Sequence, residues 1–335
     1  MKDYNNSVKQ IAIVDSSHEL VEKVLEFIDD KFEFEITTRN DSDYVFHSVH
    51  GYDVLKYKGV RIFVSGENVS PNFSISDYAM TFDRLEFGDR YIWLPLIKLY
   101  REAYSALCMP RPPVHEIIPQ KTDFCAYVMS NLTNSAEERS RIFDILSTYK
   151  PVNSGGLWRN NVGGRVSDKL SFQSKHKFVI AFENCSYPGY ITEKFAEAAA
   201  SNAVPIYWGD PQIASLFNPK AFVNCHDFPS LEAVGKRVRE IDNDTIQYQQ
   251  MLTEPWFSEG REPEYLRDEV FTQFLENIFK QDPKSAYRRN RGRWGQKKEK
   301  QLDEMWSKPH LQGLKILRNR WRLIYRKFVP KRKRY

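Results

Sequence analysis

The sequence predicts an α/β protein of two domains, each a parallel sheet covered by helices, that face each other. The chain has 335 residues, which is too long for one small core and fits two domains of roughly 150 residues each. Short β-type runs alternate with helical patterns in both halves, as in parallel sheets with crossover helices. A proline-rich passage at residues 109–115 separates the halves. This is the outline of two facing domains of the nucleotide-binding type.

The first half contains one helical pattern and four β-type runs. Apolar side chains recur near a 3.6-residue period over residues 18–30, which predicts a helix with one face on a core. The β-type runs lie at residues 11–15, 44–47, 60–64 and 78–83.

The alternation resumes after the proline-rich passage. Helices are predicted over residues 135–149 and 192–201. The β-type runs lie at residues 124–129, 178–182, 204–208 and 222–224.

The charge is distributed unevenly along the chain. Residues 281–335 carry 19 Lys and Arg against 4 Asp and Glu, whereas the first 280 residues carry 30 against 40. The body is therefore acidic and the tail basic, which argues against a nucleic-acid-binding domain. The four cysteines are scattered and the first residues contain no long apolar run, so we expect a cytoplasmic protein with reduced thiols and no signal peptide or membrane anchor.

The segment from 178 to 228 carries the chemistry. A buried-type strand ends at Phe182, a turn with Pro188 and Gly189 follows, and a helix opens at Thr192. Ligands of open α/β sheets bind outside such strand ends, and the helix N-terminus suits a phosphate. Lys194 would add a cation there, although Thr192-Glu193 reads equally well as an ordinary capping arrangement.

Other nucleotide and metal motifs are missing from the sequence. There is no GxGxxG and no GxxxxGK[ST], which excludes the dinucleotide fingerprint and the P-loop. Asp41-Ser42-Asp43 has the form of a metal-binding Asp-x-Asp, but it lies in the N-terminal half and is interpreted as a solvated turn.

Two blocks of sequence resemble the α-1,3/4-fucosyltransferases, family ten of the glycosyltransferases. The first block comprises residues 182–184 (FEN), 190–194 (YITEK), 204–209 (VPIYWG), 222–224 (FVN) and 227–228 (DF). The second, similar to the acceptor half of bacterial members, comprises residues 65–73 (SGENVSPNF), 77–79 (DYA) and 89–91 (DRY). The match covers roughly residues 60–228 in the correct order.

The resemblance implies a GT-B type fold, in which two Rossmann-like domains face a cleft, and a metal-independent reaction that inverts the anomeric carbon. Residues 1–120 would bind the acceptor, residues 121–280 would bind GDP-fucose, and residues 281–335 would form a basic helical tail. No cofactor beyond the donor substrate GDP-fucose is expected.

Inversion in one displacement needs a base on the face opposite the leaving diphosphate. Glu67 follows the run at 60–64 and a Ser-Gly turn, and the resemblance places the family's proposed base at this position. From the residues alone, a loop carboxylate that caps backbone N–H groups near Asn68 and Ser70 would be the better interpretation.

The resemblance assigns the donor site to residues of the second half. Lys194 and Arg139 are expected to meet the diphosphate, with Arg141 as a competing assignment and a solvated helix face as the alternative for both arginines. Tyr190 would donate to phosphate or pack on the nucleotide, and Glu183 would join the site or hold the turn. The remaining assigned residues are Asn131, in the Ser-Asn pair before the arginine, and Asn184 and Glu193, which would fix ribose or fucose hydroxyls.

The tail is predicted to form a basic amphipathic helix. From residue 311 it has ten basic and no acidic residues, with an apolar stripe of Leu314, Leu317, Trp321, Ile324 and Phe328. Such a helix can lie on an anionic membrane surface or pack on the protein body; we favour the membrane, at its inner face.

The expected function is transfer of L-fucose from GDP-fucose to the GlcNAc of N-acetyllactosamine-type acceptors, such as lipid-linked glycans of a bacterial lipopolysaccharide, with an α-1,3 linkage. The alternatives are an α-1,4 linkage, another sugar donor on the same fold, and a glycan-binding protein without turnover. The sequence gives no oligomeric state.

Overall fold

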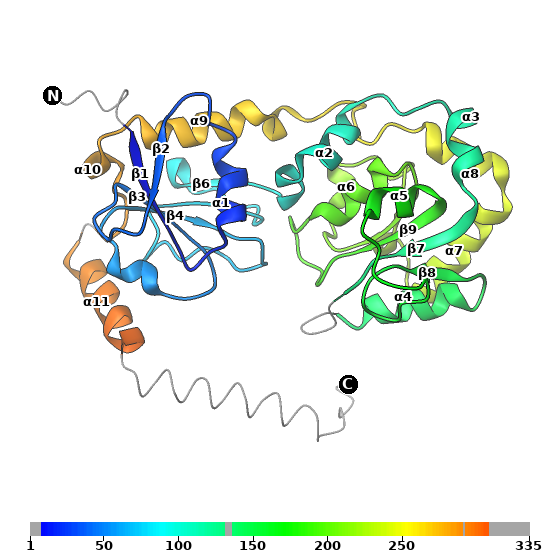
Figure 1. The fold of residues 1–335 in the computed structure, drawn as a ribbon, viewed down its shortest axis with the longest axis horizontal. Helices are drawn as coiled ribbons and strands as arrows, with labels where there is room; N and C mark the ends of the chain where they lie inside the picture. The colour runs from blue at the N-terminus through cyan, green and yellow to red at the C-terminus, as the bar shows by residue number, and fades with distance from the viewer. Residues whose placement is uncertain (1–7, 131–135, 291, 308–335) are drawn as a thin grey trace, which may run out of the picture.

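Two α/β domains lie side by side in the computed structural model, which describes residues 8–130, 136–290 and 292–307 (Figure 1). Each domain is a parallel sheet with helices on its faces, as the sequence predicts. Loops that follow the carboxyl ends of strands in both sheets line one cavity between the domains, where a ligand of such a fold binds.

The sheet of the first domain has, in the described residues, six parallel strands in the order β2-β1-β3-β4-β5-β6. Their bounds are β1 (Lys9–Val14), β2 (Phe34–Thr37), β3 (Tyr44–His47), β4 (Val60–Val64), β5 (Tyr78–Thr81) and β6 (Tyr91–Trp93). Strands β3, β4 and β5 are buried at every position, which explains their continuous apolar runs. The sequence analysis missed β2, a half-exposed edge strand, and β6, which has only three residues.

The sheet of the second domain has, within the described ranges, five parallel strands in the order β11-β10-β9-β7-β8. They are β7 (Asp123–Tyr127), β8 (Val152–Ser154), β9 (His176–Phe182), β10 (Val204–Trp208) and β11 (Val223–Asn224). The four runs predicted here are confirmed, and the three-residue β8 was missed.

Helices connect and cover these strands. They are α1 (His18–Leu25), α2 (Arg101–Cys108), α3 (Val114–Ile117), α4 (Glu138–Ser147), α5 (Lys169–Ser174), α6 (Glu193–Ala200), α7 (Leu231–Asn243) and α8 (Thr245–Thr253). Helix α1 is shorter than predicted and begins after Ser17, whose hydroxyl accepts a hydrogen bond from the backbone N–H of Leu20. The proline-rich passage at 109–115 lies between α2 and α3 and includes the first two residues of α3. Helix α2 before it already packs on α6 of the second domain, so the role of this passage as the join stays a prediction.

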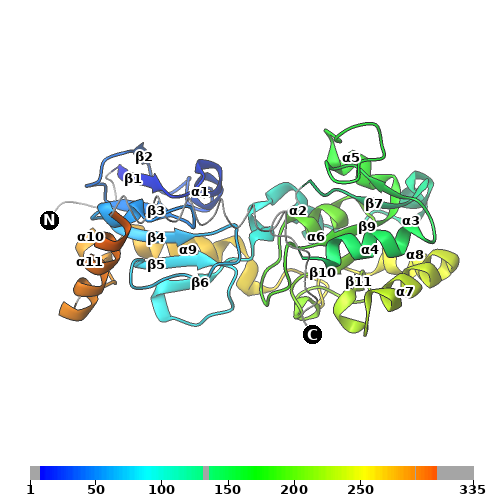
Figure 2. The same ribbon diagram turned by 90° about the horizontal axis from the view of Figure 1, so that it is seen from below.

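The C-terminal part of the described chain returns to the first domain. Figures 1 and 2 show α9 (Asp268–Phe279), α10 (Pro283–Ala286) and α11 (Arg293–Ser307) on that side of the molecule. Helix α9 lies within the range expected for the second domain, yet Phe271 packs on Phe27 and Phe279 packs on Tyr44, with ring centroids 5.0 and 4.4 Å apart. The division at residues 120 and 280 stays a prediction.

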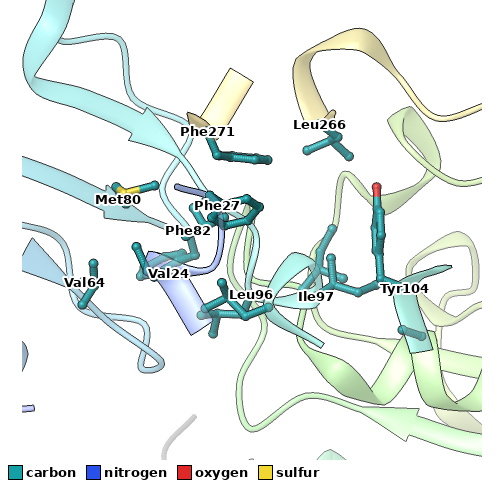
Figure 3. Close-up of a cluster of buried hydrophobic side chains, with 14 of the residues drawn as sticks. Val24, Phe27, Val64, Met80, Phe82, Leu96, Ile97, Tyr104, Leu266 and Phe271 are labelled. Atoms are coloured by element: carbon teal, nitrogen blue, oxygen red, sulfur yellow. The ribbon is translucent and has the colours of Figure 1, made fainter. Parts of the chain in front are cut away.

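An apolar cluster joins the domains near the cleft. Figure 3 shows Phe82, Leu96, Ile97, Tyr104 and Leu266 within one buried group, which continues into the first core. The backbone N–H of Ile97 also donates to the carbonyl of Ile191 at 3.0 Å. Burial of apolar surface on both sides of the cleft therefore fixes how the domains meet.

Among the described residues, no helix has the length and apolar character needed to cross a membrane. The predicted amphipathic stripe of residues 314–328 and the basic end of the tail lie outside the described residues.

Candidate active site

A cavity of about 350 Å³ lies between the two domains. The first domain contributes Glu67, from the loop after β4, and the second contributes Asn184, Tyr190, Glu193 and Lys194, from the β9–α6 connection. Five of the eight residues that the sequence analysis assigned thus line one space, because the carboxyl ends of parallel strands share an edge of each sheet.

Glu67 is held by a local turn. The hydroxyl of Ser65, at the end of β4, donates to the Glu67 carbonyl at 2.8 Å and accepts from the Glu67 N–H at 3.0 Å. The residue is exposed and lines the cavity. Among the described residues, its carboxylate accepts no hydrogen bond from a backbone N–H group near Asn68 or Ser70. The geometry therefore does not support the alternative role of Glu67 as a loop-capping carboxylate.

Glu183 lies beneath the cavity and is fully buried. Its two carboxylate oxygens accept hydrogen bonds of 2.7 Å from the N–H and the hydroxyl of Thr192. Its oxygen Oε2 also lies 3.1 Å from Nζ of Lys194. Of the two roles expected for Glu183, the geometry shows the second: it holds the turn and, through it, the lysine.

Lys194 is surrounded by acceptors. Its ammonium donates to Oγ1 of Thr192 at 2.8 Å and to Oε1 of Glu193 at 3.0 Å, in addition to its ion pair with Glu183. Burial lowers the pKa of Lys194, but the two carboxylates outweigh burial, so the pKa is raised and the group stays a cation.

The two carboxylates beside Lys194 differ in environment. Burial raises the pKa of Glu183, and Lys194 only partly offsets this. Burial also acts to raise the pKa of Glu193, but Lys194 and Lys169 outweigh it, so the pKa of Glu193 is lowered. Glu193 is therefore an ionised carboxylate at the cavity wall, suited to accept hydrogen bonds from hydroxyl groups.

The start of α6 is not an ordinary capped end. Thr192 occupies the N-cap position, but its side chain makes no capping hydrogen bond. The hydroxyl donates to Glu183 instead, because that buried carboxylate needs several donors. The capping alternative drawn from the sequence is therefore wrong.

Arg139 reaches the site from α4. Its side chain is 5% exposed, and Nη1 donates to Oδ1 of Asn184 at 2.8 Å. The carbonyl of Asn184 accepts from the N–H of Ala136 at 2.9 Å, which ties the same loop to the start of α4. Arg141, the competing assignment, lies 3.0 Å from Glu232 of α7 and is half exposed, so the geometry favours Arg139 over it. Arg139 is not the solvated arginine of the alternative interpretation.

Tyr190 lines the cavity although it is only 2% exposed. Its ring packs edge-on against Phe82 of the first domain, with centroids 5.6 Å apart. Burial raises the pKa of its hydroxyl, which therefore stays protonated and can donate a hydrogen bond. Asn131, the remaining assigned residue, lies outside the described residues.

The domains touch each other around the cavity. Gly189 has φ +84°, and a Cβ atom there would lie 2.2 Å from the carbonyl oxygen of Phe82. Nδ2 of Asn68 lies 2.9 Å from Sγ of Cys185, next to Glu67. Glycine is therefore required at 189 both by its backbone conformation and by the close approach of the other domain.

The sequence analysis missed several residues of the first domain that line the cavity. Ser48 and His50 follow β3, while Lys23 projects from α1 and Tyr100 precedes α2. The sequence could have indicated Ser48 and His50, because they follow a predicted parallel strand, and ligands bind at the carboxyl ends of such strands. Among the described residues, no group of three or more His, Cys, Asp or Glu side chains is arranged to hold a metal ion.

Comparison with known protein families matches both halves of the chain. The N-terminal domain of α-(1,3)-fucosyltransferase FucT matches residues 8–100, and the C-terminal region of glycosyltransferase family 10 (fucosyltransferase) matches residues 118–260. Together the two matches span more than half of the chain.

Individual proteins are similar as well. The chain is 36% identical to the α-(1,3)-fucosyltransferase FucT of Helicobacter pylori over 246 residues, which is 64% of this chain and 51% of that protein. It is 31% identical over 141 residues to the human 4-galactosyl-N-acetylglucosaminide 3-α-L-fucosyltransferase FUT6, covering 41% of this chain and 38% of that one. The chain thus spans about half or less of the length of these relatives.

Solved structures agree with the fold. A crystal structure of an α1,3-fucosyltransferase superposes with a TM-score of 0.72 at 29% identity, over 84% of this chain and 93% of that one. The Anabaena protein Alr3699/HepE, in complex with UDP and glucose, superposes with a TM-score of 0.51 over 81% of this chain and 99% of that one, but at 8% identity it shows the fold alone. With both halves matched in order, the chain belongs to family ten of the glycosyltransferases, the fucosyltransferase family.

Proposed function

We propose that this protein transfers L-fucose from GDP-fucose, with inversion, to the 3-hydroxyl of GlcNAc in N-acetyllactosamine-type acceptors. One observation carries the proposal: Glu67 of the first domain lines the same cavity as the Glu193-Lys194 pair of the second, and within the described ranges its carboxylate has no ion-pair partner. A similar α1,3-fucosyltransferase has been crystallised with GDP-fucose, at a TM-score of 0.70 and 28% identity, which supports this donor.

In the proposed reaction Glu67 removes the proton from the acceptor hydroxyl as its oxygen attacks the anomeric carbon of fucose. The bond between that carbon and the diphosphate breaks, and GDP leaves with the electron pair. The products are the fucosylated acceptor and GDP, and the proton remains on Glu67 until water removes it. The negative charge that grows on the diphosphate needs cations already in place.

Lys194 and Arg139 supply those cations in this proposal. Both are fixed before the donor arrives, Lys194 by the buried Glu183 and Arg139 by Asn184. Groups that do not have to reorganise stabilise a developing charge most effectively. Glu193, exposed to the cavity beside Lys194, would accept hydrogen bonds from fucose hydroxyls, and Tyr190 would donate to a phosphate oxygen.

GDP release tests the proposal. The protein is incubated with GDP-fucose, with and without N-acetyllactosamine, in the presence of a chelator. Release that depends on the acceptor, with an α-1,3-linked product by NMR, supports it. Tight binding of GDP-fucose without transfer would move the search to other acceptors, and no binding of GDP-fucose would refute the donor.

For the basic tail we propose peripheral attachment to an anionic membrane at the cytoplasmic face, where lipid-linked glycans would serve as acceptors. The support is the sequence pattern of residues 311–335 alone. Co-sedimentation with vesicles that contain anionic lipid, but not with neutral vesicles, tests it; equal sedimentation with both would refute it.

A further inference from the structure

A second hollow opens beside the active-site cavity. It has a volume of about 650 Å³, compared with about 350 Å³ for the cavity, and both share Lys23, Leu99 and Tyr100 as walls. We call it the side groove; α1, α2, α5 and α6 border it, so both domains form its walls. A ligand that occupies the cavity can therefore extend directly into the side groove.

The surface of the side groove is partly apolar. Its walls include Leu99, Ala103, Ala106 and Leu170, of which Leu170 is 51% exposed. Small alanines on α2 keep the groove open, since larger side chains there would fill it. Volumes of about 300–1,000 Å³ are typical of sites for small ligands.

Tyr100 stands where the cavity and the side groove meet. It is 37% exposed, and the ammonium of Lys23 lies over its ring, 4.6 Å from the centroid. This cation–π contact holds the ring in one orientation. Burial raises the pKa of Tyr100 to about 12, so its hydroxyl remains a hydrogen-bond donor at neutral pH.

The charges of the side groove balance. Its lining has three basic residues, Lys23, Arg101 and Lys169, and three acidic ones, Glu26, Glu102 and Glu197. The basic groups are already paired: Lys23 with Glu19 at 2.8 Å, Arg101 with Glu26 at 2.7 Å, and Lys169 with Glu197. Such a surface has no excess positive charge for a nucleotide or an anionic lipid, but it offers many polar atoms to a neutral ligand.

We propose that the side groove binds neutral sugar units of the acceptor beyond the one that receives fucose, with Tyr100 packing against a pyranose ring at the entrance. The apolar C–H face of a pyranose matches an aromatic ring and an alanine-lined wall, and its hydroxyls match the paired charges. This inference rests on the proposed function, because it assumes a saccharide acceptor in the cavity. The inference implies that contacts in the side groove make the enzyme favour longer acceptors.

The test compares two acceptors that each contain one GlcNAc: the disaccharide N-acetyllactosamine and the tetrasaccharide lacto-N-neotetraose. We expect the native protein to prefer the tetrasaccharide by about tenfold in kcat/KM, which corresponds to about 1.4 kcal/mol. Ala106→Trp fills the side groove and should reduce the preference to about one. Ser105→Trp, an exposed position on the same helix outside the groove, is the matched control and should keep the preference.

Three results would overturn the inference. The native protein could show equal kcat/KM for both acceptors, or Ala106→Trp could keep the preference while its melting temperature matches that of the control. A raised KM for GDP-fucose in Ala106→Trp, with an unchanged acceptor ratio, would assign the groove to the donor.

Direct binding separates this inference from the proposed function. If neither acceptor is fucosylated, the proposed acceptor class is wrong. Saturation-transfer NMR with the tetrasaccharide then still tests whether the side groove binds the acceptor. Loss of signal in Ala106→Trp but not in Ser105→Trp supports binding in the groove. Equal signals in both variants, or no signal with the native protein, overturn the inference.

Discussion

Replacing Glu183 by glutamine should destabilise the protein because of where that carboxylate lies. The residue is fully buried and its oxygens receive three donors: the N–H and hydroxyl of Thr192, and the ammonium of Lys194. Glutamine keeps the shape but offers one acceptor oxygen and one NH₂ group. The NH₂ group would face a donor, which leaves a buried polar contact unmade.

The size of the effect follows from the burial. Removing one partner of a buried ion pair costs about 3–5 kcal/mol. Lys194 keeps Glu193 as a second partner, so we expect the lower end, about 3 kcal/mol. At about 2–4 °C per kcal/mol for domains of 150–250 residues, Tm should fall by about 6–12 °C.

Glu193→Gln is the matched control, because Glu193 pairs with the same lysine at nearly the same distance. The side chain of Glu193 is 22% exposed, compared with 0% for Glu183. A partly exposed pair contributes about 1 kcal/mol or less, so Tm should fall by about 4 °C at most. Thermal unfolding followed by circular dichroism measures both variants. Equal losses of Tm would refute burial as the cause.

Four further predictions concern the site, the contact between the domains and the first domain. Glu67→Gln should lower kcat by about 10²–10⁴-fold, the usual effect of losing a general base, and should leave the Kd for GDP, measured by calorimetry, unchanged. Lys194→Ala should instead weaken GDP binding by about 10–100-fold, because a charge-assisted hydrogen bond is lost. Gly189→Ala should lower the free energy of unfolding by more than about 1 kcal/mol in urea titrations, since the new methyl group would meet the carbonyl of Phe82. Burial, with Arg61 and Arg289 adding to it, lowers the pKa of His47 to about 3. The unfolded chain therefore binds a proton that the folded protein does not, and stability should fall as the pH drops from about 6.5 toward 4, by up to about 1.4 kcal/mol per pH unit.

Three of these predictions, those on Lys194, Gly189 and His47, have a control. Lys236 is an exposed lysine of α7, so Lys236→Ala should leave the affinity for GDP unchanged. An equal loss of GDP affinity in Lys236→Ala would show that Lys194 does not contact the diphosphate. Gly66→Ala, where no atom lies within 4 Å of the added methyl group, should not change stability, so an equal loss at both glycines would contradict the steric argument. His47→Asn should flatten the acid slope of the unfolding free energy; the same slope in both proteins would exclude His47 as its source.

Much of the fold follows from local patterns. Strand β4 is buried at every position and β9 is buried from Phe178 to Phe182, so both sequences are mainly apolar, and a hydropathy pattern detects them. Strands β2, β6 and β8 were not predicted because they are short or half exposed and lie at the sheet edges. A pattern of three or four residues carries too little periodicity to distinguish a strand from a loop.

Long-range packing was not predictable in the same way. The sequence of α9 shows that it needs an apolar surface, but not which surface. Only the tertiary structure shows that Phe271 and Phe279 pack on the first domain, more than two hundred residues earlier in the chain. The choice depends on the shape of a core that is assembled from distant segments.

By itself, the sequence determined two parallel-sheet domains and the sheet edges where Glu67 and Lys194 would lie, since the carboxyl ends of parallel strands share one edge of a sheet. Only the tertiary structure decided which partner each charged group has. It turned Glu183 inward to Lys194 and directed Arg139 to Asn184. These choices follow from burial, because a charge removed from water must pair with whatever group the surrounding fold brings near, and local spacing does not encode that neighbour.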